Sequence, residues 1–170
     1  ERNATQILEF AGMPSSLVAT KNLDYIEATK ELKAGDIDAF FCTAGLTTTV
    51  IDELSKECDI RLIPLTDTVI SKMLESSSAY TSEVIPAGTY TGQDTAISTI
   101  GVKSVLITKS DVSDDTIEQL TSLLFEKENE LSYSNSLKLE LTYNFATDGI
   151  PIPFHNGAKR YYEDCGYSIN

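Results

Sequence analysis

Hydrophobic residues follow two patterns along this chain, one typical of helices and the other of buried strands. Helical spacing of hydrophobic residues predicts helices at 3–11, 23–34, 50–58 and 67–74. Short, nearly continuous hydrophobic runs predict strands at 37–41, 60–65 and 82–85. Because helices and strands alternate along the chain, the pattern predicts an α/β fold with mostly parallel sheets and right-handed crossover connections.

Small and polar residues mark the expected ends of these helices. Gly12 closes the first helix, and Gly35 follows the second, where a left-handed residue is favoured. Asn22 is the candidate N-cap of the second helix, and Asp67 is the candidate N-cap of the fourth. We therefore expect the first two helices to end at their glycines, the second of them directly before a strand.

The second half of the chain begins with a break in this alternation. The stretch 86–93 contains one proline and two glycines and predicts a boundary between two lobes. An extended segment at 98–108 follows, and Ser113 opens a helix that is predicted to end near Glu130. The hydrophobic residues of 137–145 alternate as in a strand and equally form one helical stripe, so their period leaves this segment open.

The only histidine, His155, stands at the start of a short helix near the C-terminal end. Pro151 and Pro153 hold the chain extended before this helix, Asn156 is its candidate cap, and Gly166 is expected to end it. One hydrophobic face of the helix is formed by Ala158, Tyr161, Tyr162 and Cys165. His155 therefore either braces the start of the helix or faces a cleft.

Composition restricts the classes of partner. A chain of 170 residues with 41% hydrophobic residues is long enough for one generous domain or two small lobes with a sizeable core. The formal net charge of −13 repels phosphate backbones and anionic lipids, so nucleic acid and membrane surfaces are poor candidates. The chain opens at Glu1 without a methionine and already in a helical pattern, so we expect residues upstream of it, and the N-terminus does not identify the compartment.

Little in the sequence indicates an enzyme, a metal site or a cofactor. Cys42, Cys58 and Cys165 are far apart and fit no metal-ligand spacing, and the last two are expected to be buried on hydrophobic helix faces. The chain contains no nucleophile elbow, phosphate-binding glycine loop or zinc-protease motif. A dyad of Cys42 and His155 is the remaining hydrolase hypothesis.

The loop that follows the predicted strand 37–41 is a better candidate site. Ligands of open α/β sheets bind beyond the carboxyl ends of the strands. The N–H groups of Ala44 and Gly45 and the hydroxyl of Thr43 stand where a helix begins, which suits a carboxylate or another anion. The same threonine-rich loop, with Thr47 and Thr48, is equally suited to capping its helix, and the local sequence leaves both interpretations open.

Three motifs occur in order over nearly the whole chain. They are GDIDAFF at 35–41, IPAGTYTG at 85–92, and PFHNGA at 153–158 with RYY at 160–162. Together they resemble the TAXI family of solute-binding receptors of tripartite TRAP transporters. The resemblance implies the type II fold of periplasmic binding proteins, in which two lobes with mixed, mostly parallel sheets close over a small ligand, often glutamate or another carboxylate.

The resemblance also implies how the chain is divided. Residues 1–88 would form most of the ligand-binding lobe, 89–98 the hinge region, and 99–170 the C-terminal part of the other lobe, whose N-terminal part is expected to be missing. Such a partial lobe exposes hydrophobic surface, so we expect self-association or domain swapping. The family further favours a helix over 137–145.

The function implied by the resemblance is solute capture without catalysis, cofactor or metal. The chain would be an extracytoplasmic receptor, periplasmic or lipid-anchored, that delivers a small anionic solute to a membrane permease. Thr43, Ala44, Gly45 and Tyr90 are the expected ligand-facing residues, and a structural role at the hinge is the alternative for Tyr90. Asn156 stands where the family usually has a proline, a conservative change for the start of a helix. The loop 42–46 lacks its usual proline, which leaves the identity of the ligand open. A sensory domain of the same fold in a signalling protein is the alternative function.

Overall fold

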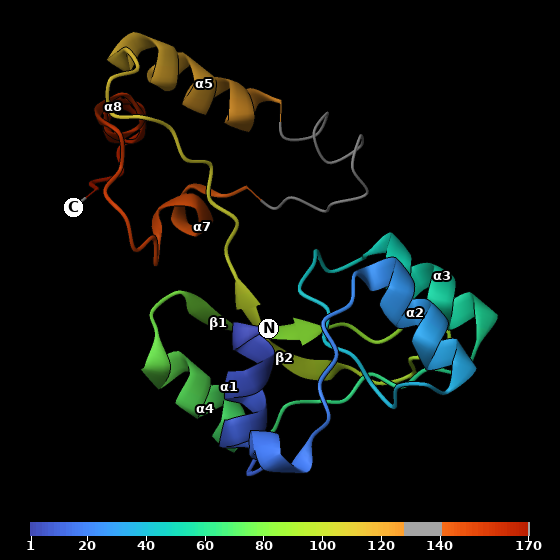
Figure 1. Cartoon of the computed structure of the whole chain (residues 1–170). Helices are drawn as coiled ribbons and strands as arrows, with labels where there is room; N and C mark the ends of the chain where they lie inside the picture. Colours follow the sequence, from blue (N-terminus) through green and yellow to red (C-terminus); the bar gives the residue numbers. More distant parts are fainter. Residues whose placement is uncertain (128–140, 170) are drawn as a thin grey trace. The chain divides into compact units, whose positions relative to one another are not determined.

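The computed structural model describes residues 1–127 and 141–169, which divide into two compact units, Glu1–Val102 and Lys103–Asn170. The first unit contains α1 (Arg2–Phe10), a 3₁₀ turn η1 (Ser15–Leu17), α2 (Tyr25–Ala34), α3 (Thr49–Glu57), α4 (Asp67–Ser76), β1 (Tyr80–Ile85) and β2 (Ile97–Val102). The second contains α5 (Asp114–Glu126), α7 (Tyr143–Thr147) and α8 (Asn156–Asp164) (Figure 1). No helix in the described part of the chain is long and hydrophobic enough to cross a membrane.

The four helices predicted in the first half are confirmed as α1 to α4, but two of their predicted caps are wrong. Asp24, not Asn22, caps α2 by accepting a hydrogen bond from the Glu27 N–H at 2.8 Å. Thr66, not Asp67, caps α4, because a capping oxygen must stand just outside the first turn. Gly35 is confirmed as the left-handed C-cap of α2, with φ +79°.

The predicted mostly parallel sheet is wrong for the described residues. Their one sheet is the antiparallel pair of β1 and β2, with a register from Tyr80↔Val102 to Ile85↔Ile97. The predicted strand at 82–85 is confirmed as part of β1, whereas 37–41 and 60–65 are not strands. A strand requires a ladder of main-chain bonds to a neighbour, and 60–65 meets β2 through the bond from Leu65 N–H to Ser98 O, at 2.9 Å.

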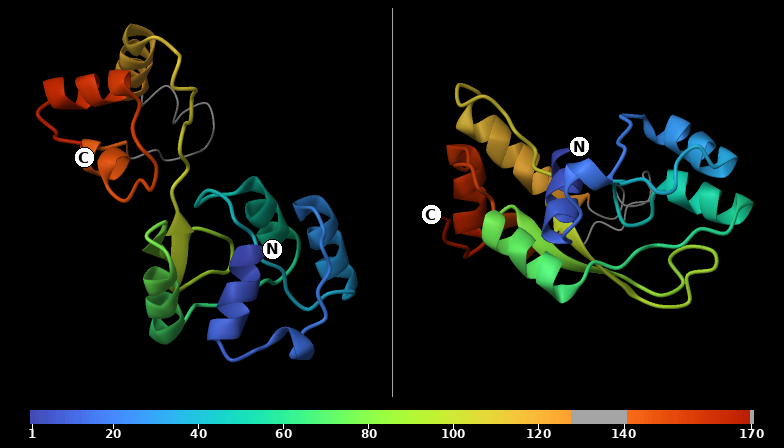
Figure 2. Two further views of the ribbon diagram at one scale, coloured as in Figure 1. Left: turned by 60° about the vertical axis from the view of Figure 1, so that its left-hand side comes forward. Right: turned by 60° about the horizontal axis from the view of Figure 1, so that its bottom comes forward.

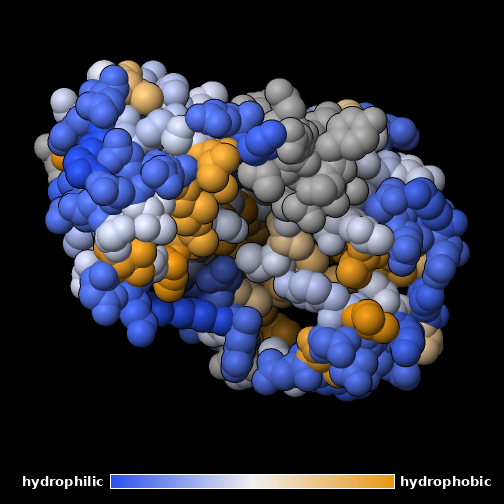
Figure 3. All heavy atoms as spheres, turned by 90° about the horizontal axis from the view of Figure 1, so that it is seen from above, coloured by the Kyte–Doolittle hydropathy of each residue, from blue (hydrophilic) through white to orange (hydrophobic). Residues whose placement is uncertain are grey.

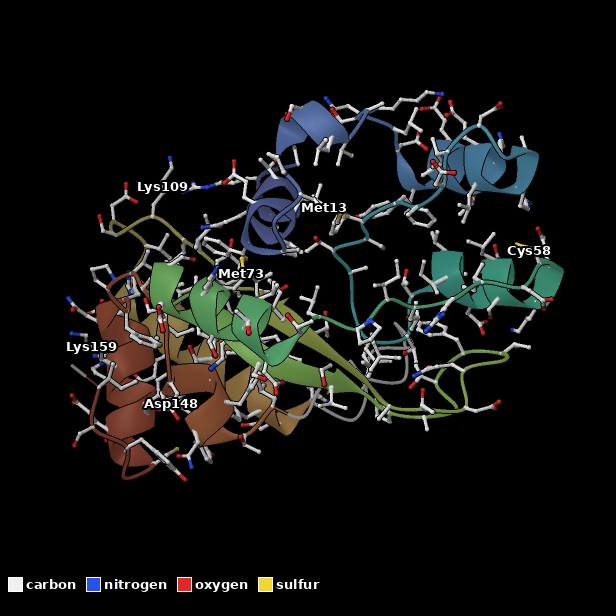
Figure 4. All side chains as sticks on the ribbon, turned by 90° about the horizontal axis from the view of Figure 1, so that it is seen from below. Met13, Cys58, Met73, Lys109, Asp148 and Lys159 are labelled. Atoms are coloured by element: carbon white, nitrogen blue, oxygen red, sulfur yellow. The ribbon has the colours of Figure 1, made fainter. Side chains whose placement is uncertain are left out.

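The core of the first unit lies between α1, α4 and the strand pair. Met73 of α4 is 0% exposed and clusters with Ile7 of α1 and Val69 of α4. The partly buried side chains packed around this cluster are Phe10, Leu65, Tyr80 and Ile100. Figure 4 shows Met73 between α1 and α4, and both views in Figure 2 place α4 beside the strands. The hydrophobic faces of these helices therefore meet as their periodicity predicts.

In the second unit, α5 and α8 pack against each other at close range. Ser113 is confirmed as the N-cap of α5, with its hydroxyl accepting from the Thr116 N–H at 3.2 Å. The guanidinium of Arg160 on α8 bridges the carboxylates of Asp115 and Glu118 on α5, at 2.7 and 2.6 Å. Stacked and edge-on rings fill the space beside these helices, contributed by Phe125, Tyr143, Phe154, Tyr161, Tyr162 and Tyr167.

Two predicted boundaries in this unit are only partly covered by the described residues. The helix predicted to reach Glu130 ends at Glu126, with Lys127 as its C-cap, and Glu130 itself lies outside the described residues. Of the ambiguous segment 137–145, residues 137–140 also lie outside them. Leu141 and Thr142 are not helical, and Thr142 is the N-cap of α7, so the helix that the resemblance favours is confirmed only for residues 143–145 of this segment.

His155 braces the start of α8, as one of the two predicted roles requires. It is the N-cap, and its Nδ1 accepts a hydrogen bond from the Gly157 N–H at 3.1 Å. Asn156 is therefore the first helical residue, and its prediction as the cap is wrong. Gly166 follows the helix with φ +85° as predicted, but Cys165, which was expected to be buried, is exposed because α8 ends one residue earlier.

Many large hydrophobic side chains remain exposed, and Figure 3 shows several hydrophobic patches on one face. The predicted extended segment 98–108 is a strand only as far as Val102. Beyond it, Val105, Leu106 and Ile107 are 40%, 69% and 73% exposed. Exposed hydrophobic surface of this kind favours association, and self-association stays a prediction.

The structure places the predicted hinge region in a defined position. Residues 89–98 lie mainly in the loop between β1 and β2, within the first unit, and the two compact units divide instead between Val102 and Lys103. The lobe boundaries at 88 and 98 and the closure of lobes around them stay predictions.

Candidate functional site

The candidate loop 43–48 leads directly into the N-terminus of α3. Thr48 is the N-cap of α3, with φ −83° and ψ 132°, but its side chain makes no capping hydrogen bond. The interpretation that the Thr48 hydroxyl caps this helix is therefore wrong. The first N–H groups of α3 are left without that partner, and they add to the positive end of the helix dipole.

Two tyrosine hydroxyls hold the main chain of this loop. The Tyr25 hydroxyl, from α2, donates to Thr43 O at 3.0 Å and accepts from Thr43 N–H at 3.1 Å. The Tyr90 hydroxyl, from the β1–β2 loop, donates to Leu46 O at 2.5 Å and accepts from Thr48 N–H at 3.3 Å. Both ends of the loop are thus fixed by side chains that come from other elements.

Between these fixed points, the loop offers main-chain donors. The N–H groups of Ala44, Gly45 and Leu46 have no hydrogen-bond partner among the residues that the structure describes, and all three residues are exposed. N–H groups of this kind beside a helix N-terminus suit a carboxylate or another small anion. Three of the residues predicted to face a ligand, Thr43, Ala44 and Gly45, lie in this loop.

Tyr90, the fourth predicted residue, also contacts this loop, but its hydroxyl binds the main chain of the loop. It is 7% exposed, and burial raises the pKa of its phenol above the ordinary value. Its hydroxyl is already engaged with Leu46 and Thr48. This geometry fits the structural alternative for Tyr90, while a direct ligand contact stays a prediction.

The loop that contains Tyr90 is held in turn by Gln93. The Gln93 Nε2 donates to Pro86 O and Thr95 O, both at 3.0 Å, and its Oε1 accepts from Tyr90 N–H at 3.3 Å. This turn lines an open hollow of about 410 Å³ together with Ile60, Arg61, Leu62 and Pro64. Both the Nε2 and the Oε1 of Gln93 are engaged in hydrogen bonds within the turn.

Tyr25 is a residue of this site that the sequence alone does not identify. No local pattern connects its side chain with Thr43, 18 residues further along the chain. Only the packing of α2 against α3 brings the hydroxyl to the loop.

The hypothesis of a Cys42–His155 dyad gains no support from the surroundings of either side chain. Cys42 lies in the first unit and His155 in the second. Burial raises the pKa of the Cys42 thiol, and a hydrogen bond with Tyr25 offsets only part of that effect. The His155 Nδ1 is engaged with Gly157 N–H. The described residues also contain no group of three or more side chains that could hold a metal ion.

We expect Cys42 to react slowly with thiol reagents, although it borders the candidate site. A raised pKa leaves less thiolate at a given pH, so iodoacetamide at pH 8 should label exposed Cys165 at least about tenfold faster than Cys42. Mass spectrometry of the labelled peptides over time measures both rates in one sample. Labelling of Cys42 first would indicate an activated thiolate and restore the dyad hypothesis.

The model of the NMT1-like family matches residues 1–166, so the chain belongs to the NMT1-like family. This is a periplasmic-binding-protein-like family of the solute-binding type. The expected class of protein is therefore confirmed at this level, and a candidate site for a small molecule is consistent with it.

Proposed function

We propose that this chain is an extracytoplasmic receptor that captures a small anionic solute, such as glutamate or another carboxylate, and delivers it to a membrane permease. Families of this solute-binding type are typically extracytoplasmic. The three motifs at 35–41, 85–92 and 153–162 support the narrower assignment to the TAXI receptors of TRAP transporters. The proposed activity is binding without catalysis.

The observation on which the proposal rests is the set of main-chain donors in the loop 43–48. Ala44, Gly45 and Leu46 present N–H groups with no partner among the described residues, next to the N-terminus of α3. A carboxylate placed there would receive several charge-assisted hydrogen bonds and lie at the positive end of the helix dipole. The hydroxyl of Thr43 is the adjacent side-chain donor.

The site has to overcome the charge of the chain as a whole. At a net charge of −13, an anion approaching at random is repelled, and the repulsion is screened beyond about 8 Å at physiological salt. Hydrogen bonds at contact distance are weakened little by salt, so a short-range site of N–H donors can bind an anion despite the unfavourable net charge. Closure at the predicted hinge near Tyr90 to Gln93 would then favour the liganded state by adding contacts from the second lobe.

Calorimetry with L-glutamate, L-glutamine and succinate tests the proposal on the 170-residue chain. We expect at least one of the carboxylates to bind, and the substitution Gly45→Asp to weaken that binding at least about 100-fold, because a carboxylate beside the ligand repels it. Thr68→Asp, which adds the same charge in the first turn of α4, is the matched control and should bind like the wild type.

The outcomes separate the function from the site. If neither L-glutamate nor succinate, the two anions of the set, binds the wild type, the proposal of an anion receptor fails. If an anion binds the wild type and Gly45→Asp equally well, the receptor function stands and the assignment of the loop as its site is wrong.

A further inference from the structure

We propose that Tyr25 and Tyr90 are positioning residues, whose hydroxyl groups hold the loop 43–48 in the shape that presents its N–H groups to a ligand. This inference rests on the proposed function for its role in binding. It concerns residues that contact the main chain of the loop rather than the ligand.

The contacts of Tyr25 are local to one residue of the loop. Its hydroxyl both donates to Thr43 O and accepts from Thr43 N–H. One side chain therefore satisfies both main-chain polar groups of Thr43. Tyr25 is the first residue of α2, and the helix is capped by Asp24. The phenol is therefore mounted on a rigid, capped helix end rather than on another loop.

The contacts of Tyr90 are at the other end of the loop. Its hydroxyl joins Leu46 O and Thr48 N–H, and so spans the last residues before α3. The main chain of Tyr90 is itself fixed, because the Gln93 Oε1 accepts from its N–H. Burial of the ring, at 7% exposed, restricts the phenol to this position.

The two sets of contacts have a common consequence. They fix Thr43 on one side and Leu46 and Thr48 on the other, so that Ala44 and Gly45 lie between restrained residues. A loop ordered before binding spares the ligand the entropic cost of ordering it. The two hydroxyls should therefore increase affinity for an anion without touching it.

Phenylalanine substitutions remove each hydroxyl and keep each ring. Tyr25→Phe and Tyr90→Phe are compared with Tyr80→Phe, because the Tyr80 hydroxyl also makes a hydrogen bond, to Asn3 Oδ1 at 2.9 Å, but lies outside this network. All three variants lose one phenolic hydrogen-bond group in the same unit. A difference between them therefore reports the place of the hydroxyl and not its loss alone.

The first readout is amide hydrogen exchange in the absence of ligand. We expect exchange at Thr43 in Tyr25→Phe, and at Thr48 in Tyr90→Phe, to accelerate about tenfold, the effect of losing one hydrogen bond. Residues of α4 should exchange as in the wild type. Tyr80→Phe should leave the loop 43–48 unchanged. If neither Tyr25→Phe nor Tyr90→Phe changes exchange in the loop, or if Tyr80→Phe changes it equally, the positioning role is wrong.

The second readout is the affinity for L-glutamate by calorimetry. Tyr25→Phe and Tyr90→Phe should each bind L-glutamate about five- to tenfold more weakly than the wild type, and Tyr80→Phe should bind it like the wild type. Accelerated exchange in the loop together with unchanged glutamate affinity would overturn the positioning role. If the wild type binds succinate but not glutamate, the same affinities are compared with succinate. If it binds neither, the proposed function fails, while the exchange data still decide whether the two hydroxyls order the loop.

Discussion

Replacing Gly157 with alanine is expected to destabilise the second unit by about 3 kcal/mol, the upper end of the usual cost of overpacking. A Cβ atom at this position would lie 2.1 Å from Asp114 O and 2.9 Å from Glu118 N. Both are main-chain atoms of α5, so no side-chain rotation can relieve the collision. Alanine favours a helix over glycine by about 1 kcal/mol, which is too little to compensate.

Urea unfolding followed by circular dichroism measures this effect as a lower midpoint. Asn156→Ala is the matched control, because it introduces the same residue at the exposed neighbouring position of α8, and its midpoint should stay close to the wild type. A wild-type midpoint for Gly157→Ala would mean that α5 and α8 do not approach each other as closely as Arg160 and its two carboxylate partners indicate.

The helices of this chain could be predicted well because their signals are local. The periodicity of the first half located α1 to α4, and Ser113 located the start of α5. The caps were less certain, since Asn22 and Asp24 lie two residues apart and only the actual first turn decides between them. The predicted burial of Cys165 was wrong for a related reason, because the predicted helical face extended one residue beyond the end of α8.

The sheet could not be predicted in the same way. Hydrophobic runs at 37–41 and 60–65 have the composition of buried strands, but a strand also needs a partner, and the partner is set by contacts distant in sequence. In the described residues only β1 and β2 form a ladder. Phe41 and Ile63, at 48% and 71% exposed, show that composition alone does not place such a run in a core.

The residues of the candidate site also differ in whether local sequence identifies them. Thr43, Ala44 and Gly45 were identifiable from their position before a helix, since a helix N-terminus with small residues is a local signal. Tyr90 was identified through the motif at 85–92, that is, through the resemblance to a family and not through a local rule. Tyr25 was missed because its contact with Thr43 depends on how α2 packs against α3.

Met73→Ala is expected to destabilise the first unit by about 2–5 kcal/mol, the range for removing a large buried side chain without collapse of the site. Met73 is fully buried between Ile7 and Val69, and the described residues contain no other large side chain buried to that degree. The cavity would open between α1 and α4, the contact that joins the first helix to the unit (Figure 4).

The neighbouring residue supplies the control for this prediction. Leu74→Ala removes a similar volume from the same helix, but Leu74 is 38% exposed, so its cost should stay below about 1.5 kcal/mol. Urea unfolding of both variants measures the two free energies, and hydrogen exchange in α1 should accelerate in Met73→Ala alone. Because the loop 43–48 is held by Tyr25 and Tyr90 and not by this core, its exchange should change only with global unfolding. Equal losses for the two variants would show that α1 does not pack on α4 through Met73.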